Sequence, residues 1–476
     1  MRRQWQQGQR SAGRDAFRGQ KYLRPRYCAY TLHNFRDLPQ LELLSTEERS
    51  AIEVVAQVLP FKTNNYVVEE LINWDDVPQD PLFILNFPQR EMLRPQHFEE
   101  IAHLLRSRAD EGEIREAVNR IRVQLNPHPA GQLEHNVPML GRTKLTGMQH
   151  KYRETVLFFP SNSQTCHAYC TFCFRWPQFV GLDGLRFAMR ETQLLVGYLR
   201  QHSEVTDVLF TGGDPMTMSA RNLASYVEPL LGASLSSLRT VRIGTKALSY
   251  WPYRFLTDDD AEDLLNLFRR ITESGTHLAI MAHFNHPREL GTAAVERAIE
   301  RIKATGAEIR TQSPLLRGIN DDPAIWSKMW QRQVELGCVP YYMFVARDTG
   351  AHRYFSMPLV RAWEIFRDAY QRVSGLGRTV RGPIMSTDPG KVEVLGVTEV
   401  ARKKLIALRM IQGRNADWAM RPFFARYDPK ATWLSDLRPA VGGAFFFEKE
   451  LQRLRRCACS DRSSRASRLD KGARDL

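Results

Sequence analysis

Three cysteines lie close together in a chain that otherwise contains few. Cys166, Cys170 and Cys173 have the spacing C-x3-C-x2-C, and the whole chain of 476 residues has seven cysteines. Three thiolates on one short loop can hold three irons of a cubane iron–sulfur cluster and leave the fourth iron open. A structural zinc site needs a fourth protein ligand, and nearby only His167 offers one. We therefore predict a 4Fe-4S cluster at these cysteines.

The cysteines follow the first of six short apolar segments that alternate with segments of helical spacing. Six such units in series predict an α/β protein with a parallel sheet and right-handed crossovers. Since a complete barrel needs eight units, we expect a partial (β/α)6 barrel, with functional residues at the C-terminal ends of its strands. The expected strands are 155–160, 207–211, 240–245, 277–283, 308–313 and 339–345, and the expected helices are 190–202, 222–231, 259–274, 292–304, 323–336 and 358–373.

Five regions are expected along the chain. Basic, disordered tails at 1–26 and 452–476 flank a helical N-terminal region at 27–150, the barrel at 151–380 and a C-terminal extension at 381–451. In the N-terminal region, Ser45 and Glu48 form a capping box before a helix, and further helices are expected at 96–107 and 112–125. In the extension we expect a helix over Thr398–Gly413. The aromatic-rich stretch that follows it either covers the barrel mouth or packs on the barrel exterior.

The composition is that of an ordinary folded protein. Hydrophobic residues make up 43% of the chain and aromatic residues 10%, which excludes collagen-like and wholly disordered classes. No apolar run reaches the ~18–20 residues of a membrane helix. No apolar segment follows Arg2 and Arg3 as an export signal would require, so we expect a cytoplasmic protein without membrane association.

The positive charge is concentrated at the two ends. The net charge is +14, and residues 1–26 hold eight Lys and Arg against one Asp, while residues 452–476 hold eight against three Asp. Basic tails can contact nucleic acid, but solvated, disordered ends are the commoner case. We therefore expect no nucleic-acid partner.

The cysteine segment resembles a known enzyme superfamily. Cys166-His-Ala-Tyr-Cys170-Thr-Phe-Cys173 is similar to the motif of radical S-adenosylmethionine (SAM) enzymes, in which SAM chelates the open iron. Residues 55–395 further resemble the lysine 2,3-aminomutase family. The stretches that carry this resemblance are Gly212-Gly213-Asp214-Pro215, His283-Phe-Asn-His-Pro287, Gln312-Ser-Pro-Leu-Leu-Arg-Gly-Ile-Asn-Asp321 and Pro340-Tyr-Tyr342.

The resemblance implies positions for two further cofactors. Gly212, Gly213, Asp214 and Pro215 would hold SAM through their backbone, with His283 and Gln312 as further cofactor contacts. Singly, the glycine turn could be only a turn, and His283, His286, Gln312 and Asn320 could be structural. Pyridoxal phosphate (PLP) would form a Schiff base with Lys391, in a loop after the barrel where a reachable amine suits this chemistry. Lys151 stands where the family has one PLP-binding arginine, Thr155 where it has another, and Phe344 where it has a tyrosine.

The resemblance also suggests how a substrate is read. Arg175 matches the family arginine that binds the substrate carboxylate through a guanidinium fork. Arg347 stands where the lysine-specific enzyme has an aspartate for the distal ammonium, with Asp348 beside it. A cation at that position would repel an ammonium. We therefore expect a substrate with a distal carboxylate or a neutral side chain, with Asp348 leaving lysine open.

The activity that the resemblance implies is amino-group migration from Cα to Cβ of a small amino acid. The cluster would pass an electron from a donor such as flavodoxin or ferredoxin to SAM, and the resulting radical would take a β-hydrogen while PLP carries the amino group. A homo-oligomer is compatible with the sequence. Two other interpretations stay open: a radical SAM enzyme that modifies a protein lysine or a nucleoside without PLP, and a non-enzymatic Fe–S protein that binds nucleic acid.

Overall fold

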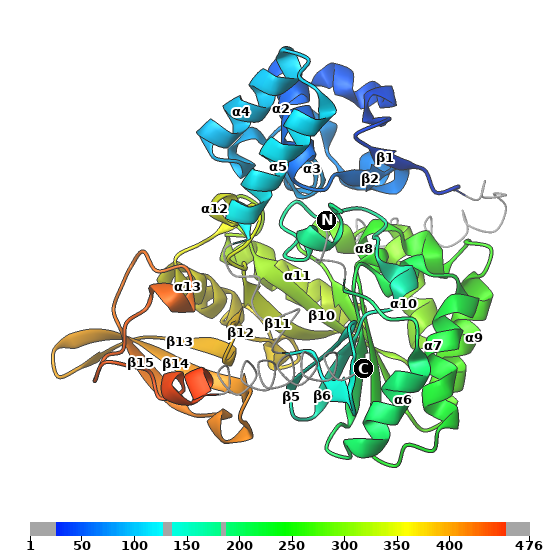
Figure 1. The fold of residues 1–476 in the computed structure, drawn as a ribbon, viewed down its shortest axis with the longest axis vertical. Coiled ribbons are helices and arrows are strands. Elements are labelled where there is room, and N and C mark those ends of the chain that lie inside the picture. The colour runs from blue at the N-terminus through cyan, green and yellow to red at the C-terminus, as the bar shows by residue number, and fades with distance from the viewer. Residues whose placement is uncertain (1–24, 127–135, 182–186, 454–476) are drawn as a thin grey trace, which may run out of the picture.

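A large mixed sheet forms the centre of the protein (Figure 1). The structure is a computed structural model and describes residues 25–126, 136–181 and 187–453. The sheet has 11 strands in the order β15-β14-β13-β12-β11-β10-β9-β8-β7-β6-β5. Strands β6 to β12 run parallel to one another, and antiparallel strands complete both edges. The parallel strands are β6 (Thr155–Phe158), β7 (Asp207–Phe210), β8 (Thr240–Thr245), β9 (His277–His283), β10 (Glu308–Leu315), β11 (Val339–Val345) and β12 (Arg381–Ser386).

The six predicted strands are therefore confirmed, and so is the α/β class. A seventh parallel strand, β12, was not expected. Helices connect the parallel strands and cover one face of the sheet, as the predicted alternation requires (Figure 1). They are α6 (Thr192–Gln201), α7 (Ala220–Gly232), α8 (Ala247–Tyr250), α9 (Ala261–Glu273), α10 (Ala293–Lys303), α11 (Pro323–Glu335), α12 (His352–Phe355) and α13 (Leu359–Tyr370).

Alternate residues of each parallel strand face the helices. Val241 and Ile243 on β8 are fully buried in the main core, whereas Arg242 between them is half-buried and faces the opposite side. Because side chains alternate along a strand, polar residues at the alternate positions share this second face. The first strand of the sheet, β5 (Met148–Tyr152), also lies close to the last parallel strand, β12. Lys151 on β5 donates a hydrogen bond to the carbonyl oxygen of Thr387, directly after β12. The sheet therefore curves, and we call the side facing away from the helices its inner face.

The predicted helix over Thr398–Gly413 is wrong. This segment belongs to a long hairpin of β13 (Gly390–Val400) and β14 (Lys403–Gly413), followed by β15 (Pro422–Arg426). The buried residues Ile406, Leu408 and Met410 alternate with less buried ones, which is the period of a strand. The hairpin turn, Ala401–Arg402, has positive φ at both residues (49° and 61°). A turn of this kind usually carries glycine or asparagine, so the usual sequence signal is absent.

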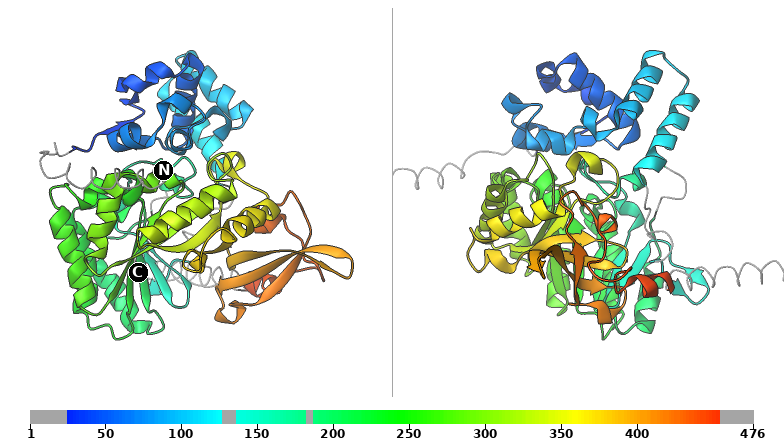
Figure 2. Two further views of the ribbon diagram at one scale, coloured as in Figure 1. Left: turned by 180° about the vertical axis from the view of Figure 1, so that it is seen from behind. Right: turned by 90° about the vertical axis from the view of Figure 1, so that its left-hand side faces the viewer.

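The aromatic-rich C-terminal stretch packs on the outside of the sheet, one of the two predicted alternatives. Its side chains form a second core with β13 to β15 and with Leu359 and Trp363 of α13. The aromatic members are Trp418, Phe423, Trp433, Phe445, Phe446 and Phe447. This packing holds the C-terminal sheet beside the parallel strands (Figure 2).

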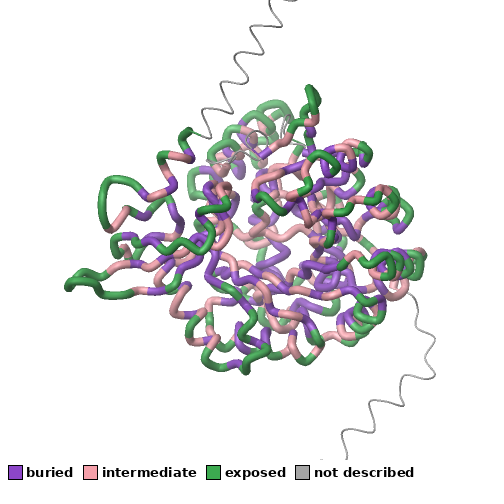
Figure 3. The backbone as a smooth tube through the Cα atoms, turned by 90° about the horizontal axis from the view of Figure 1, so that it is seen from below, coloured by how far each residue is buried: buried purple, intermediate pink, exposed green. Residues whose placement is uncertain are grey.

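The N-terminal region lies over the end of the parallel sheet from which α8 emerges (Figures 1 and 2). Its first long helix begins with the predicted capping box, in which Ser45 and Glu48 bond each other's backbone amides. The strand pair β1–β2 accompanies these helices, whereas the pair β3–β4 lies against α6. Buried residues of this region belong to the same core as those of the sheet, and Figure 3 shows buried backbone, in purple, through the interior of the fold. The elements are β1 (Ala29–Thr31), α2 (Thr46–Val58), β2 (Lys62–Asn64), α3 (Pro81–Asn86), α4 (Pro95–Arg106), α5 (Glu111–Leu125), β3 (Met139–Leu140) and β4 (Thr143–Lys144).

Two expectations concern parts of the chain outside this description. The predicted disordered tails fall almost wholly on residues 1–24 and 454–476, which lie outside the described residues, as do Cys457 and Cys459. Among the described helices, none is long and apolar enough to cross a membrane.

Candidate active site

The three clustered cysteines lie together on the loop after β6, at the C-terminal end of that strand. All three are free thiols and half-buried. They line a pocket with an empty volume of about 300 Å³, part of which is open to solvent. The other side chains of this pocket include His167, Tyr169, Asp214, Lys246 and Tyr250. Three thiols around one open space are what a cluster with one open iron requires.

The N-terminal region fixes the backbone of this loop. The amide of Tyr169 donates to the carbonyl oxygen of Lys62 at 2.7 Å, and the amide of Thr171 donates to that of Leu85 at 3.0 Å. The hydroxyl of Thr171 also donates to the carbonyl oxygen of Ile84 at 2.7 Å. The loop is therefore held between two parts of the fold that are distant in sequence.

Burial keeps the three thiols neutral. It raises the pKa of Cys170 to about 12 and that of Cys173 to about 11, and it raises the pKa of Cys166 well above its ordinary value. Thiols must lose their protons to bind iron, so cluster binding at this loop would release protons.

The turn Gly212–Pro215 after β7 packs against the start of the cysteine loop. A Cβ on Gly213 would lie no more than 2.5 Å from the carbonyl oxygens of Ser163 and Thr165, so only glycine fits there. Gly212 has φ +147°, which also favours glycine. The backbone of this turn thus touches the backbone of the cysteine loop.

The carboxylate of Asp214, beside the pocket, is held by hydrogen bonds within the protein. It accepts hydrogen bonds from the Thr245 hydroxyl at 2.7 Å, the Lys246 amide at 2.8 Å and the Met216 amide at 2.9 Å. Asp214 is 3% exposed, and burial raises its pKa. Its side chain therefore positions the ends of β7 and β8, which leaves the backbone of the turn as the part that could meet a ligand.

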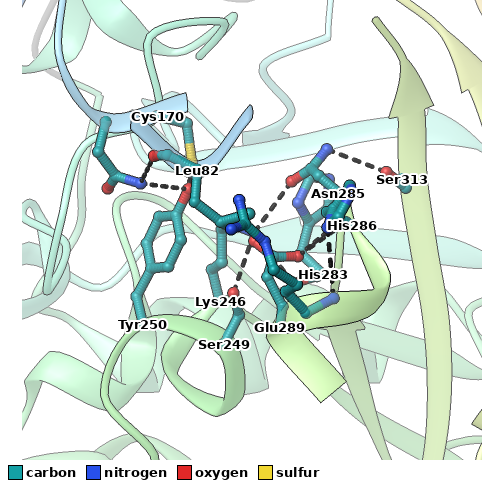
Figure 4. Close-up of polar contacts among 12 residues, drawn as sticks. Leu82, Cys170, Lys246, Ser249, Tyr250, His283, Asn285, His286, Glu289 and Ser313 are labelled. Carbon is teal, nitrogen blue, oxygen red and sulfur yellow. Dashed lines mark hydrogen bonds and ion pairs between the residues drawn. The ribbon is translucent and has the colours of Figure 1, made fainter. Parts of the chain in front are cut away.

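A buried ion pair that the sequence analysis did not single out lies beside the pocket (Figure 4). The ammonium of Lys246 bonds Glu289 at 2.8 Å and Asn285 at 2.9 Å, and it lies 4.2 Å from the ring centroid of Tyr250. The Tyr250 hydroxyl in turn lies 3.9 Å from the Cys170 sulfur. Lys246 directly follows β8, and side chains directly after parallel strands are the ones expected to act. That rule would have found it.

His283 and Gln312 end up next to each other. They are paired across β9 and β10 near the C-terminal ends of these strands. The ring of Phe172, on the cysteine loop, stacks on His283 with centroids 5.9 Å apart. Burial, with the Lys246 cation, lowers the pKa of His283 to about 3, so its ring is neutral. The structure thus joins these two predicted cofactor contacts to the cysteine loop.

His286 and Asn320 take the structural roles that the sequence left open. His286 caps a short helical turn, where its Nδ1 accepts from the Arg288 amide at 3.3 Å. Asn320 accepts from the Leu316 amide at 2.7 Å and donates to the carbonyl oxygen of Asn285 at 3.0 Å. Both side chains hold loops after the strands.

Lys391 lies on β13 and not in a loop, which corrects the sequence prediction. Strand β13 pairs with β12, Lys391 opposite Ser386. The Lys391 amine donates to Gln412 at 3.0 Å and lies between two rings, 4.9 Å from the centroid of Tyr342 and 5.4 Å from that of Tyr152. Burial, with nearby arginine cations, lowers the pKa of Lys391 to about 7. A lysine of this kind is a neutral nucleophile near physiological pH.

Lys151 belongs to the same group of side chains. Its amine donates to the carbonyl oxygen of Thr387. Burial, with the cations Arg414, Arg347 and Lys391 nearby, lowers the pKa of Lys151 well below its ordinary value. The two predicted PLP lysines are therefore brought together where the two ends of the sheet meet.

The other two predicted PLP positions also lie on the inner face. The Thr155 hydroxyl donates to Asp207 at 2.8 Å, and Asp207 also bonds Arg242. The ring of Phe344 lies 5.0 Å from that of Tyr342, which supplies the aromatic surface beside Lys391.

The predicted substrate residues Arg175 and Arg347 meet at one aromatic ring. Each guanidinium carbon lies 5.1 Å from the ring centroid of Phe174, and Arg175 also lies 4.5 Å from that of Phe159. Burial lowers the pKa of Arg175 to about 10. Burial also lowers the pKa of Arg347, opposed by the charge of Asp348.

Comparisons with known proteins agree with these sites. An Aquifex aeolicus protein provisionally named L-lysine 2,3-aminomutase is 32% identical over 405 residues, covering 85% of this chain and 95% of its own. The chain belongs to the lysine 2,3-aminomutase family of radical SAM enzymes. The L-lysine 2,3-aminomutase of Bacillus subtilis is 28% identical over 229 residues, covering 48% of this chain and 45% of its own.

Comparison with family models and solved structures adds little to this assignment. No family model matches the chain. A crystal structure of Streptococcus suis SuiB bound to precursor peptide SuiA aligns with a TM-score of 0.34 at 13% identity, over 60% of this chain and 61% of that one. At this level the likeness carries no weight.

The predicted site residues of this family member thus form two groups. The cysteines, the glycine turn, His283 and Gln312 form the cluster end of the site. Lys391 and Lys151 form the lysine end. The positive charge of Arg347 adds to burial in lowering the pKa of Lys151. The sequence analysis missed Tyr152 and Gln412 at the lysine end, which no local motif marks, and it quoted Tyr342 only as part of the Pro340-Tyr-Tyr342 stretch.

Proposed function

We propose that this protein is a radical SAM, PLP-dependent amino acid 2,3-aminomutase. The observation that carries the proposal is the Lys391 amine, which lies between the rings of Tyr152 and Tyr342 with a pKa lowered to about 7. A surface lysine would stay protonated at neutral pH. An amine of this kind, in a protein that also presents three clustered thiols, suits an enzyme that needs both a radical and an activated amino group.

The residues present fit the three cofactors that this function needs. Cys166, Cys170 and Cys173 would hold a 4Fe-4S cluster, and the Gly212–Pro215 turn, with His283 and Gln312, would contact SAM. Lys391 would bind PLP, with Lys151 as a second amine beside it that could donate to an anionic group. When bound, these cofactors supply the radical and the electron sink for the reaction. A small electron donor such as flavodoxin or ferredoxin would supply the priming electron.

The protein itself binds and orients the substrate and excludes water from the site. The Arg175 guanidinium would take the substrate α-carboxylate, because it is half-buried and aromatic rings flank it. Tyr152 and Tyr342 shield the Lys391 amine, and Gln412 fixes its direction. The net change is an isomerisation: a hydrogen moves from Cβ to Cα, the amino group moves the opposite way, and no atom is gained or lost.

Labelling of Lys391 tests the proposal. The protein is purified anaerobically, mixed with PLP and reduced with borohydride, and the labelled peptide is mapped, with Lys391→Arg as the control. A pyridoxyl group on Lys391 that is absent from the variant supports the proposal. No label on protein that still cleaves SAM contradicts it and favours a radical SAM reaction without PLP.

A further inference from the structure

Two cations converge where the described residues place no paired anion. Arg175 and Arg347 both lie 5.1 Å from the Phe174 ring centroid, so their separation is at most twice that distance. Both side chains are half-buried, where like charges repel more strongly than in water. Within the described part of the chain neither guanidinium forms an ion pair, so an anion between them would relieve the repulsion.

The acidic side chains nearby do not make this place suitable for an ammonium. Asp388, which like Arg347 acts on the pKa of Lys151, pairs through its carboxylate with the Arg414 guanidinium at 2.5 Å. Arg414 also donates to the carbonyl oxygen of Asp388 at 2.8 Å, which holds the pair in place. The negative charge of Asp348 partly offsets the positive charge of Arg347. Arg175 is then left as a cation that no carboxylate of the described residues offsets.

The arginine pair lies between the two ends of the site. Arg175 is two residues from Cys173 in the chain, and the charges of the two side chains interact. On the other side, the positive charge of Arg347 acts to lower the pKa of both Tyr152 and Lys151. The ring of Tyr152 lies 5.4 Å from the Lys391 amine. A ligand held by both arginines would therefore lie within reach of the cluster end and of the lysine end.

We propose that the substrate is an amino acid with a second carboxylate on a side chain at least as long as that of glutamate. Arg175 binds one carboxylate and Arg347 binds the other, and the Phe174 ring between them sets their spacing. This assignment rests on the proposed aminomutase function and specifies its substrate. The reaction remains an isomerisation, and from glutamate it gives 3-aminopentanedioate, a β-amino dicarboxylate of the same formula. The same shift on aspartate would return aspartate, because its C3 is itself α to the second carboxylate, so a productive substrate needs the longer side chain.

The test is a comparison of ligand binding by calorimetry. L-Glutamate, L-aspartate, L-alanine and L-lysine are titrated into the anaerobic full-length protein, with and without PLP. We expect at least one of the acidic amino acids to bind at least about tenfold more tightly than alanine and lysine, because its second carboxylate pairs with a guanidinium that alanine leaves unpaired and that repels the lysine ammonium. Equal binding of alanine, or tighter binding of lysine, would overturn the assignment.

Variants of Arg347 and Arg175 show which of the two arginines sets the preference for acidic amino acids. Arg347→Asp should lose the preference for the acidic amino acid and gain lysine binding, whereas Arg175→Gln should weaken acidic and neutral amino acids alike. Arg347→Gln serves if the aspartate variant unfolds, and should make the acidic amino acid and alanine bind equally. Arg361→Gln, which removes an exposed arginine on α13, is the matched control and should bind as the wild type. An unchanged preference in both Arg347 variants would overturn the assignment.

The Lys391 label separates this inference from the proposed function. A label on Lys391 without any preference for acidic amino acids overturns the substrate assignment and leaves the aminomutase proposal standing. A preference for acidic amino acids without the label keeps the dicarboxylate site and overturns the aminomutase proposal.

Discussion

The two ends of the candidate site are built in different ways. At the cluster end, three cysteines come from one short loop, and backbone hydrogen bonds to Lys62 and Leu85 fix that loop. At the lysine end, Lys391, Tyr152, Tyr342 and Gln412 come from the four strands β13, β5, β11 and β14. The first is a local motif on a rigid support, whereas the second exists only because the curved sheet brings its two ends together.

The same physical cause has opposite chemical results at the two ends. Burial raises the pKa of the cysteine thiols and lowers that of Lys391 to about 7, so at pH 7 the thiols are neutral and about half of the Lys391 amines are. A neutral thiol cannot bind iron until the metal displaces its proton. A neutral amine is already reactive. The cluster end therefore depends on its metal, and the lysine end is prepared by the protein alone.

Removal of one cluster thiol should have the largest effect. Cys170→Ala leaves two thiols where three are needed, so we expect loss of the cluster and of SAM cleavage, with Lys391 labelling by PLP retained. Iron content and visible absorbance after anaerobic reconstitution measure this. Cys28→Ala is the control, because Cys28 is exposed and lies outside the cysteine cluster. Full iron content in the Cys170 variant would contradict the assignment.

The buried ion pair beside the cluster should show the next largest effect. Lys246→Met leaves the Glu289 carboxylate, 0% exposed, without its cation. Leaving a buried charge unpaired costs about 3–5 kcal/mol, which urea unfolding would measure. The double variant Lys246→Met, Glu289→Gln should recover part of this loss. Equal stability of the single variant and the wild type would mean that the pair is not buried in solution.

Gly213→Ala should have a smaller effect that is confined to the cluster end. The added Cβ would meet the backbone of Ser163 and Thr165, and overpacking of this kind costs about 1–3 kcal/mol. We expect lower stability and less bound iron, with unchanged PLP labelling of Lys391. Gly232→Ala is the control, because no heavy atom lies within 4 Å of the position of its Cβ. Equal iron content in both variants would argue that the turn does not position the cysteine loop.

The pH dependence of the lysine end should show the smallest change. PLP captures only the neutral amine, so labelling of Lys391 should rise with pH, with a midpoint of about 7. Gln412→Leu removes an acceptor that stabilises the charged amine, so its midpoint should lie lower. One hydrogen bond of about 0.5–1.5 kcal/mol corresponds to about one pH unit or less. A wild-type midpoint near 10 would show that the amine is not buried.

The same contrast explains what could be predicted from the sequence. The cysteine spacing and the six βα units are local patterns, and both the thiol cluster and the strands lie where those patterns put them. The surroundings of Lys391 depend on contacts such as Lys391 with Tyr152, 239 positions earlier in the chain, and no local pattern reports those. The helix predicted over 398–413 failed because a hairpin turn made of Ala401 and Arg402 lacks the usual glycine or asparagine.

The hydrogen bonds between the cysteine loop and the N-terminal region also bear on how the cluster is acquired and lost. A protein that delivers iron and sulfide has to reach the three thiols while the amides of Tyr169 and Thr171 are bonded to Lys62 and Leu85. The loop is thus held in one conformation by a neighbouring part of the chain before any iron arrives. A change in the N-terminal region that weakens these bonds would therefore alter how the cluster is assembled without touching a cysteine.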